Sequence, residues 1–409
     1  MEAQIRRIKR DLDEINAFNA TPNAGVTRIT FSKEYAGATR YVVEELKKLG
    51  AKVSICRAGN VRGRLDGSER DEPAVMVGSH IDTVVHGGRF DGVAGVVAAL
   101  EAARVIAENR IPHRSPIDVA VFPEEEGSRF GSLLMGSRAW AGKLSLEDLG
   151  RIKDSEGTSY LDAMEQAGAV PEDQSVLAPG QLKAMLELHI EQSVILDSRG
   201  LRLGIIEAIA GIRQFLVTVE GTANHAGGTP MGLRRDALQG AARMISAVED
   251  IANHEATDRT VATVGFIRCE PGQSNIIPGR VQFSLDIRDV DPRALGAAVE
   301  KIMNAIEKTS TARGLAYRIE PRSDTPPVPL SQDVVALMER AAEARGVKAL
   351  RMISGALHDS SVLAELTDVG MIFLPSKDGR SHCPEELTDL EHIKTGTDVL
   401  LDCLIALSS

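Results

Sequence analysis

Aromatic residues, cysteines and long apolar runs are all scarce in this chain. Only 3% of its 409 residues are aromatic, and its four cysteines show no C-x-x-C spacing. Scattered cysteines are typical of free thiols in a reducing compartment rather than of a disulfide framework. No apolar run is long enough to cross a bilayer, and the N-terminal segment lacks the apolar block of a secretory signal. We therefore expect a cytoplasmic protein with no membrane partner.

Concentrated positive charge is also missing. The formal net charge is −11, and the sequence has no dense block of lysine and arginine. Phosphate backbones are bound by concentrated basic surfaces. The composition therefore argues against nucleic acid as the main partner.

What the chain does contain is the apolar content of a globular protein, at 43%. Because 409 residues exceed the size at which one hydrophobic core usually stops growing, we expect two domains. Strands are predicted at 74–80 and 117–122, with a buried helix from Gly92 between them. Strand, helix and strand at these lengths form a βαβ unit, which builds a parallel sheet.

The middle of the chain has a different pattern, with partly alternating strands typical of a sheet that has one wet face. The predicted strands and helices of this segment are 215–220, 261–267 and 281–288, and about 233–253 and 292–313. The α/β pattern then resumes after a proline-rich stretch. We predict an α/β fold, in which a mixed, largely parallel-sheet domain at 1–211 and 328–409 carries an inserted smaller α+β domain at 212–327.

The first chemically active group lies at the carboxyl end of the predicted strand 74–80. His80 and Asp82 lie two residues apart in the segment GSHID, so in extended backbone they share a face. A metal-bound imidazole usually donates its other N–H to a carboxylate. The pair fits a metal ligand with its supporting carboxylate, and equally a structural histidine at a strand end.

The second group is Asp91, where the glycine-rich loop GGRFDG enters the predicted helix. Taken alone, this aspartate is best explained as a helix N-cap. A carboxylate can also bridge two cations, and paired metals about 3.5–4 Å apart stabilise both the attacking and the leaving atoms.

The third group is the run Glu124-Glu125-Glu126 directly after strand 117–122. Three carboxylates at the end of a buried strand repel one another and need a cation or protons for compensation. A solvated acidic turn is the alternative explanation. Because adjacent residues face different directions, one glutamate can bind a metal while its neighbour accepts a proton.

Two further histidines complete the set, His189 in LELHIE and His382 in a loop after an apolar strand. Each alone would more often be structural than a ligand. Together with His80, Asp91 and Glu126 they supply only imidazole and carboxylate, which suit zinc, manganese or cobalt. The conjunction predicts two divalent ions per chain, zinc first, with manganese, cobalt or nickel as alternatives.

These residues resemble the M20 metallopeptidase family, and within it the amidase branch of N-carbamoyl-L-amino-acid hydrolases, allantoate amidohydrolases and β-ureidopropionases. The resemblance runs along nearly the whole chain. The segments that carry it are GVTRITFS (25–32), GSHIDTVVHGGRFDG (78–92), PEEEGSRF (123–130), LELHIEQ (186–192), NHAGGTPMGLRRD (224–236), SNIIPG (274–279), GALHD (355–359) and SHCPEE (381–386).

The resemblance implies roles for individual residues. It implies His80, Asp91 and His189 around one metal, and Asp91, Glu126 and His382 around the other, so that Asp91 is the bridge. It also implies that Glu125 is the general base for the attacking water.

The same resemblance implies a middle domain of ferredoxin-like type that serves as a lid and a homodimerisation module. His225 would then reach the partner's active site and stabilise the oxyanion. The expected substrate is a small molecule with a carboxylate, bound by Asn275, Gly355 and His358 and by a bidentate pair with Arg288. Arg234 and Arg235 either contact substrate or cap the lid helix.

The resemblance favours hydrolysis of a linear ureido C–N bond, first in an N-carbamoyl-L-amino acid. Allantoate amidohydrolases typically carry glutamine where this chain has Ile212, so allantoate is the second choice, ahead of dipeptides and N-acetyl amino acids. A different class of enzyme would use Cys383 as a nucleophile beside His382. The third alternative is a binding module without chemistry, against which the complete set of five ligands and Glu125 argues.

Overall fold

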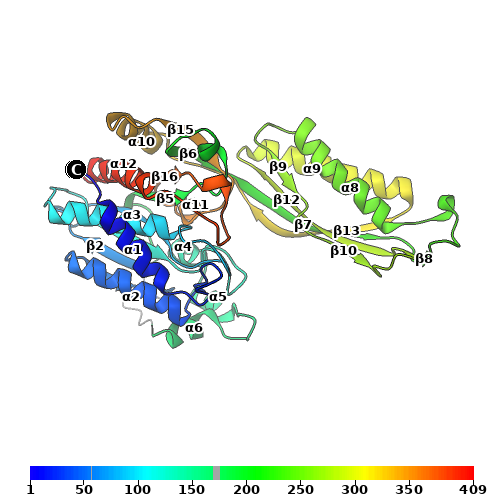
Figure 1. Cartoon of the computed structure of the whole chain (residues 1–409), viewed down its shortest axis with the longest axis horizontal. Helices are drawn as coiled ribbons and strands as arrows, with labels where there is room; N and C mark the ends of the chain where they lie inside the picture. The colour runs from blue at the N-terminus through cyan, green and yellow to red at the C-terminus, as the bar shows by residue number, and fades with distance from the viewer. Residues whose placement is uncertain (57, 169–175) are drawn as a thin grey trace. The chain divides into compact units, whose positions relative to one another are not determined.

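The computed structural model describes residues 1–56, 58–168 and 176–409. These residues form two compact units (Figure 1). The first consists of Met1–Glu207 together with Leu330–Ser409, and the second of Ala208–Pro329. The assignment of these segments as a catalytic domain and a lid stays a prediction.

The first unit is built on a mixed β-sheet. Its strands are β1 (Lys52–Ile55), β2 (Val61–Leu65), β3 (Ala74–His80), β4 (Ile117–Phe122), β5 (Leu182–Ile190), β6 (Leu203–Ile209), β15 (Ala349–Ser354) and β16 (Asp368–Leu374). They lie in the order β1-β2-β4-β3-β5-β16-β6, with β15 also paired to β6. Neighbours among β4, β3, β5 and β16 are parallel, whereas β2 and β6 are antiparallel to their inner neighbours. Parallel pairing is therefore confined to the centre of the sheet, where it includes the expected βαβ unit.

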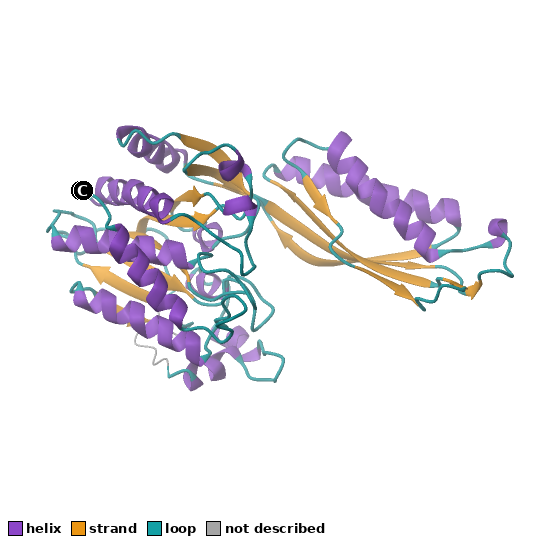
Figure 2. Ribbon diagram, viewed as in Figure 1, coloured by secondary structure: helices purple, strands orange, loops and turns teal. Residues whose placement is uncertain are grey.

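Helices enclose the central strands, which explains their nearly continuous apolar sequences (Figure 2). Every residue of β3 and β4 is buried. The helices of this unit are α1 (Ile5–Ala17), α2 (Lys33–Lys48), α3 (Val93–Glu108), α4 (Met135–Trp140), α5 (Leu146–Arg151), α6 (Tyr160–Gln166), α7 (Ile195–Ser198), α10 (Gln332–Ala344), α11 (Asp359–Leu363) and α12 (Leu390–Ser408), with a 3₁₀ turn at Lys377–Gly379. Of these, α3 and α12 pack on β3 and β5, and α10 and α11 pack on β16.

Helix α3 approaches the sheet closely at Gly95. A Cβ atom at this position would overlap the carbonyl oxygen of Leu188 and lie 2.7 Å from the Cβ of Ser79. These two neighbours immediately precede His189 and His80 in their strands. The small residue therefore seats the first turn of α3 at the edge of the sheet where the predicted ligands lie.

The second unit is an antiparallel sheet with two helices on one face (Figure 2). Its elements are β7 (Gly211–Glu220), β8 (Asn224–His225), a 3₁₀ turn (Met231–Leu233), α8 (Ala237–His254), β9 (Val261–Thr263), β10 (Ile267–Glu270), β11 (Ile276–Ile277), β12 (Arg280–Asp289), α9 (Pro292–Arg313), β13 (Ala316–Thr325) and β14 (Val328–Pro329). The main sheet has the order β10-β12-β7-β13, with β9 also paired to β12. Burial alternates along the whole of β12, as expected of a sheet with one wet face.

Two parts of this unit differ from the pattern prediction. The expected strand 261–267 is two strands, because Ser284 Oγ accepts the backbone N–H groups of Gly265 and Phe266 between them. Strand β13 was not predicted at all. Its sequence is polar, it lies at the edge of the sheet, and its register shifts between Pro321 and Ser323. Proline is tolerated at such edges and bulges, so composition alone hides the strand.

Within the described ranges, no helix has both the length and the apolar character needed to span a membrane. Among the described residues no cysteine forms a disulfide, as the sequence predicts, and Cys56 and Cys403 are buried. Gly95 is the residue of this fold that most directly supports the predicted site, because its lack of a side chain lets α3 approach the sheet.

We expect Gly95→Ala to lower the free energy of unfolding by about 1–3 kcal/mol, because the added methyl group overpacks the contact with β5. The matched control is Gly150→Ala in α5, where the new Cβ would meet only Leu161, at 3.8 Å. Alanine is the better helix former, so this variant should gain about 0.5–1 kcal/mol. Urea unfolding of the two variants measures both changes, and equal shifts would contradict the close approach of α3.

Candidate metal centre

Four adjacent strands bring the predicted ligands to one edge of the sheet. His80 is the last residue of β3, and Glu126 follows the end of β4. His189 is near the end of β5, and His382 lies in the loop after β16. Because these strands are parallel neighbours, their carboxyl ends meet at the same edge, where open α/β sheets place their sites.

Asp91 enters this edge from the loop before α3. The N-cap of α3 is Gly92, and no side chain caps it, so the N-cap explanation of Asp91 is not needed. The carboxylate instead accepts hydrogen bonds at Oδ2 from Gln192 Nε2 and Ser381 Oγ, both at 2.8 Å. Asp91 is 4% exposed, so its charge is almost completely removed from water.

The five predicted ligands form two groups of three that share Asp91. One group is His80, Asp91 and His189, and the other is Asp91, Glu126 and His382; in each, the ligand atoms lie within 4.8 Å of one another. Oδ1 of Asp91 faces the first group, at 3.5 Å from His80 Nε2 and 3.3 Å from His189 Nε2. Oδ2 faces the second group, at 3.3 Å from His382 Nε2. The two oxygens of one carboxylate therefore serve different groups.

The spacing within each group fits a metal ion better than direct hydrogen bonds. Two atoms that each lie about 2.1 Å from a tetrahedral zinc ion are about 3.4 Å apart. The two histidine Nε2 atoms of the first group are 3.4 Å apart, and His382 Nε2 is 3.5 Å from Glu126 Oε1. Together with the three Asp91 distances, these make five separations, which all lie between 3.3 and 3.5 Å. The donor set and its spacing therefore fit two divalent ions.

The buried histidines also have the orientation that metal ligation requires. His80 Nδ1 lies 3.1 Å from the backbone oxygen of Asp82, and His189 Nδ1 lies 3.0 Å from that of Ile190. An Nδ1–H donated to each carbonyl leaves Nε2 with its lone pair toward the cluster. The carbonyl of Asp82, rather than its carboxylate, is thus the hydrogen-bond partner of His80. The carboxylate is 3.8 Å from Nδ1 and accepts the backbone N–H of Glu126 at 3.1 Å.

The charges of the cluster favour a cation. Burial opposes the ionisation of Asp91, yet the neighbouring histidines His189, His382 and His80 hold its pKa well below the ordinary value. The hydrogen bond to Asp91, opposed by burial and aided by Glu126, raises the pKa of His382 to about 9. Burial and the charge of Asp91 raise the pKa of Glu126 to about 7. Without a metal, the cluster therefore retains protons as its compensating positive charge.

The three consecutive glutamates face different directions, as expected. Glu124 has a φ of 56° and accepts the backbone N–H groups of Arg129 and Phe130, so it turns away from the cluster. Glu125 turns toward it, with Oε2 at 3.7 Å from His80 Nε2. Burial, which exceeds the opposing effect of His80, raises the pKa of Glu125 well above its ordinary value. A buried carboxyl group beside the ligands is suitably placed for proton transfer.

The sequence of this chain matches a known protein family. The model of peptidase family M20/M25/M40 matches residues 76–406. The chain belongs to this family, which is metal-dependent. An N-carbamoyl-L-amino-acid amidohydrolase of Paenarthrobacter aurescens is 40% identical over 408 residues, covering 99% of this chain and 98% of the relative. An allantoate amidohydrolase of Bacillus subtilis is 34% identical, with complete coverage of both chains.

Solved structures agree with the sequence relatives. A crystal structure of an amidase of the hydantoinase/carbamoylase family from Burkholderia multivorans has a TM-score of 0.95 and 33% identity. The match covers 100% of this chain and 98% of that one. This M20 chain therefore has the mixed α/β fold of the M20 amidases.

Other predicted residues of this M20 chain lie in the second unit. His225 is exposed in β8, and the backbone N–H of Ala226 donates to the carbonyl of Asn275 at 2.9 Å. The guanidinium of Arg288 binds Asp286 of the same strand through two contacts, at 2.7 and 3.0 Å. The Nε and Nη2 groups of Arg288, the residue expected to bind the substrate carboxylate, are thus already hydrogen-bonded to a carboxylate of the same chain. The substrate-binding roles of these residues stay predictions.

Residues 355 and 358 lie in the first unit. His358 is 1% exposed, with Nε2 at 2.9 Å from Ser354 Oγ. Its ring lies edge-on to His189, with centroids 4.6 Å apart. Burial and the charge of His189 lower the pKa of His358 well below the ordinary value. A neutral imidazole therefore packs against the predicted ligand His189. Gly355 lies between β15 and α11 with no atom near its missing side chain. The substrate-binding roles of Gly355 and His358 stay predictions.

Sequence reasoning missed three polar neighbours of the ligands, namely Gln192, Ser381 and Glu386. Their only signal was their position in the segments LELHIEQ and SHCPEE. Gln192 and His382 have φ angles of 56° and 57°, in a region that non-glycine residues rarely adopt. Such strained backbone tends to cluster at functional sites.

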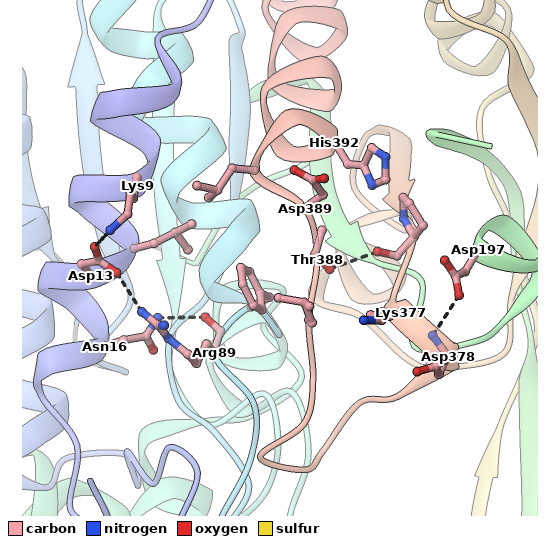
Figure 3. Close-up of a pocket in the computed structure, with 15 residues that line it drawn as sticks. Lys9, Asp13, Asn16, Arg89, Asp197, Lys377, Asp378, Thr388, Asp389 and His392 are labelled. Atoms are coloured by element: carbon pink, nitrogen blue, oxygen red, sulfur yellow. Dashed lines mark hydrogen bonds and ion pairs between the residues drawn. The ribbon is translucent and has the colours of Figure 1, made fainter. Parts of the chain in front are cut away.

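A cavity of about 650 Å³ lies next to residues 89 and 90 (Figure 3). Arg89 and Phe90 line it together with Asn16, which donates to the Arg89 carbonyl at 2.9 Å. Figure 3 shows a mixture of acidic and basic side chains around it. None of the five predicted ligands lines this cavity. This cavity is therefore distinct from the candidate metal centre.

We expect the metal content to follow the shared position of Asp91. His189→Ala should weaken one bound ion and His382→Ala the other, whereas Asp91→Ala should weaken both, because its two oxygens face different groups. Equilibrium dialysis with zinc, followed by elemental analysis, measures ions per chain. Three variants with the same residual stoichiometry would contradict a carboxylate shared between two ions.

Proposed function

We propose that this chain is a two-metal amidohydrolase that cleaves the ureido C–N bond of an N-carbamoyl-L-amino acid. Water is consumed, and the products are the L-amino acid, ammonia and carbon dioxide. The observation that carries this proposal is the 40% identity over nearly the full chain with the Paenarthrobacter aurescens N-carbamoyl-L-amino-acid amidohydrolase. The two ligand groups that share Asp91 support the same chemistry.

The proposal assigns the two groups to two divalent ions, zinc first. His80, Asp91 and His189 would hold one ion, and Asp91, Glu126 and His382 the other. When bound, such ions supply Lewis-acid polarisation of the substrate carbonyl and of the attacking water. The short and uniform separations among these ligand atoms support both assignments.

Glu125 is proposed to transfer the protons of the reaction. Its carboxyl group is buried and 3.7 Å from His80, and therefore beside the ligands without being one of them. It would accept a proton from the attacking water and return it to the leaving nitrogen. His225 of a partner subunit is proposed to stabilise the oxyanion, as the resemblance implies.

Substrate recognition is proposed to depend on Arg288, with Asn275, Gly355 and His358. A guanidinium binds a carboxylate through two parallel hydrogen bonds, and the Asp286 pair illustrates that geometry at this position. Ile212 is the direct cross-strand neighbour of Arg288 and is 6% exposed. An aliphatic side chain there offers no hydrogen bond to a second ureido group, which favours N-carbamoyl amino acids over allantoate.

Allantoate remains the alternative substrate, supported by the 34% identity with the Bacillus subtilis allantoate amidohydrolase. Dipeptides and N-acetyl amino acids are further alternatives. The second unit is proposed to act as a lid and as the contact of a homodimer. The cytoplasmic location stays a prediction from the sequence.

A panel of substrates tests the proposed activity. Purified protein loaded with zinc, manganese or cobalt should release ammonia from N-carbamoyl-L-amino acids faster than from allantoate. Allantoate has a second ureido group, which N-carbamoyl amino acids lack and which Ile212 would face without offering a hydrogen bond. N-acetyl amino acids and dipeptides, assayed by release of the free amino acid, should be the poorest substrates.

Two outcomes would overturn parts of this proposal. Faster turnover of allantoate would reverse the substrate order, and turnover limited to dipeptides would exclude ureido hydrolysis. Activity that is lost to alkylating agents but insensitive to chelators would instead favour Cys383 as a nucleophile.

We expect Glu125→Gln to lower kcat by about 10²–10⁴-fold, the usual contribution of general acid–base catalysis. The amide is nearly isosteric but cannot accept the proton of water. Metal content should stay at the wild-type value, because Glu125 is not among the proposed ligands. Near-normal turnover with both ions bound would show that another group is the base.

A further inference from the structure

Glu386 is a buried carboxylate that none of the proposed steps uses. It follows His382 by four residues and is 3% exposed. Its Oε1 accepts two backbone hydrogen bonds from the loop before α3, from Phe90 N at 2.7 Å and from Asp91 N at 3.0 Å. The side chain therefore holds the backbone of the shared ligand directly.

The other oxygen of Glu386 binds the loop that carries His382. Ser381 Oγ lies 2.9 Å from Glu386 Oε2 and 2.8 Å from Asp91 Oδ2. Ser381 thus contacts both carboxylates and is adjacent to His382 in the chain. Through its two oxygens, Glu386 connects the Asp91 loop with the His382 loop.

Gly88 shows that room for this contact is built into the Asp91 loop. A Cβ atom at residue 88 would overlap the carboxyl group of Glu386. The backbone of Gly88 is not in the left-handed region, so alanine would be strained there only by this overlap. Glu386 could move aside only by giving up its bonds to Phe90 and Asp91.

We propose that Glu386 is a positioning residue, which fixes the Asp91 loop against the His382 loop so that one carboxylate can serve both ligand groups. This inference rests on the proposed metal centre and names a residue that acts through Asp91 and His382 without binding an ion. Mutation of partners that orient metal ligands commonly lowers metal affinity or activity by about 10–100-fold.

The test compares Glu386→Ala, Glu386→Gln and a control, Glu385→Gln. The amide of glutamine retains one oxygen for the N–H groups of Phe90 and Asp91, whereas alanine retains none. Glu385 is 60% exposed at its side chain and lies 3.8 Å from Arg380, so it tests the loss of a nearby carboxylate alone. Zinc affinity is measured by chelator competition, together with the melting temperature of the metal-free protein and with kcat and KM.

Glu386→Ala should weaken zinc binding by about 10–100-fold, and Glu386→Gln should retain more of the affinity. Glu385→Gln should bind zinc like the wild type. A purely structural role predicts a different result, in which the metal-free melting temperature falls while the folded protein keeps its zinc affinity. That result would overturn the proposal.

Gly88→Ala tests the same contact from the opposite side and remains informative if Glu386→Ala does not fold. By displacing the Glu386 carboxyl group, it should weaken zinc binding in the wild-type background. In the Glu386→Ala or Glu386→Gln background, the further loss should be smaller, since contacting residues are not additive. Equal losses in the wild-type and variant backgrounds would contradict the proposal.

The zinc measurements separate this inference from the proposed function. If the wild-type protein binds no zinc, manganese or cobalt, the metal centre itself is wrong and Glu386 has no ligand to position. If the wild type binds two ions and all the variants bind them equally well, only the role of Glu386 is wrong. The identity of the substrate affects neither result.

Discussion

The site depends on one buried carboxylate that faces positive groups on both sides. Asp91 directs Oδ1 to His80 and His189 and Oδ2 to His382. An isolated buried carboxylate is costly, so this arrangement is stable only with protons or cations around it. Two contacts position this carboxylate at the sheet edge: the close approach of α3 at Gly95, and the hydrogen bonds that the backbone N–H groups of Phe90 and Asp91 donate to Glu386.

The surrounding fold brings ligands from distant parts of the sequence to that carboxylate. His80 and His382 are separated by about three hundred residues, yet β3 and β16 both flank β5 in one sheet. Parallel strands end at a common edge, and the helices between them return the chain to the opposite edge. The buried Glu187 adds a cross-connection, because it accepts hydrogen bonds from Ser79 of β3 and Ser360 of α11. The residues before His80 and after His358 are thereby tied to β5.

The sequence predicted the site best where a residue of ligand type stands at the end of a recognisable strand. His80 ends one apolar strand and the run 124–126 follows another, so their convergence could be predicted from the parallel pairing of β3 and β4. Contacts that depend on side-chain direction could not be predicted. The carbonyl rather than the carboxylate of Asp82 meets His80, and the edge strand β13 was hidden by its polar composition and its bulge. Gln192, Ser381 and Glu386 have no spacing pattern of their own, because their partners are far away in the chain.

The electrostatics of the cluster connect cation binding with the proposed role of Glu125. Burial raises the pKa of Glu125 well above its ordinary value, so burial favours the protonated form of this group. A general base must be ionised before the reaction begins. Positive charge placed among the ligands favours the carboxylate form and displaces protons from the histidines, since metal binding requires deprotonated ligands. In this arrangement the same cations that balance Asp91 would also prepare Glu125 to accept a proton, which gives a physical reason for the proposed base to lie beside the ligands rather than at a distance.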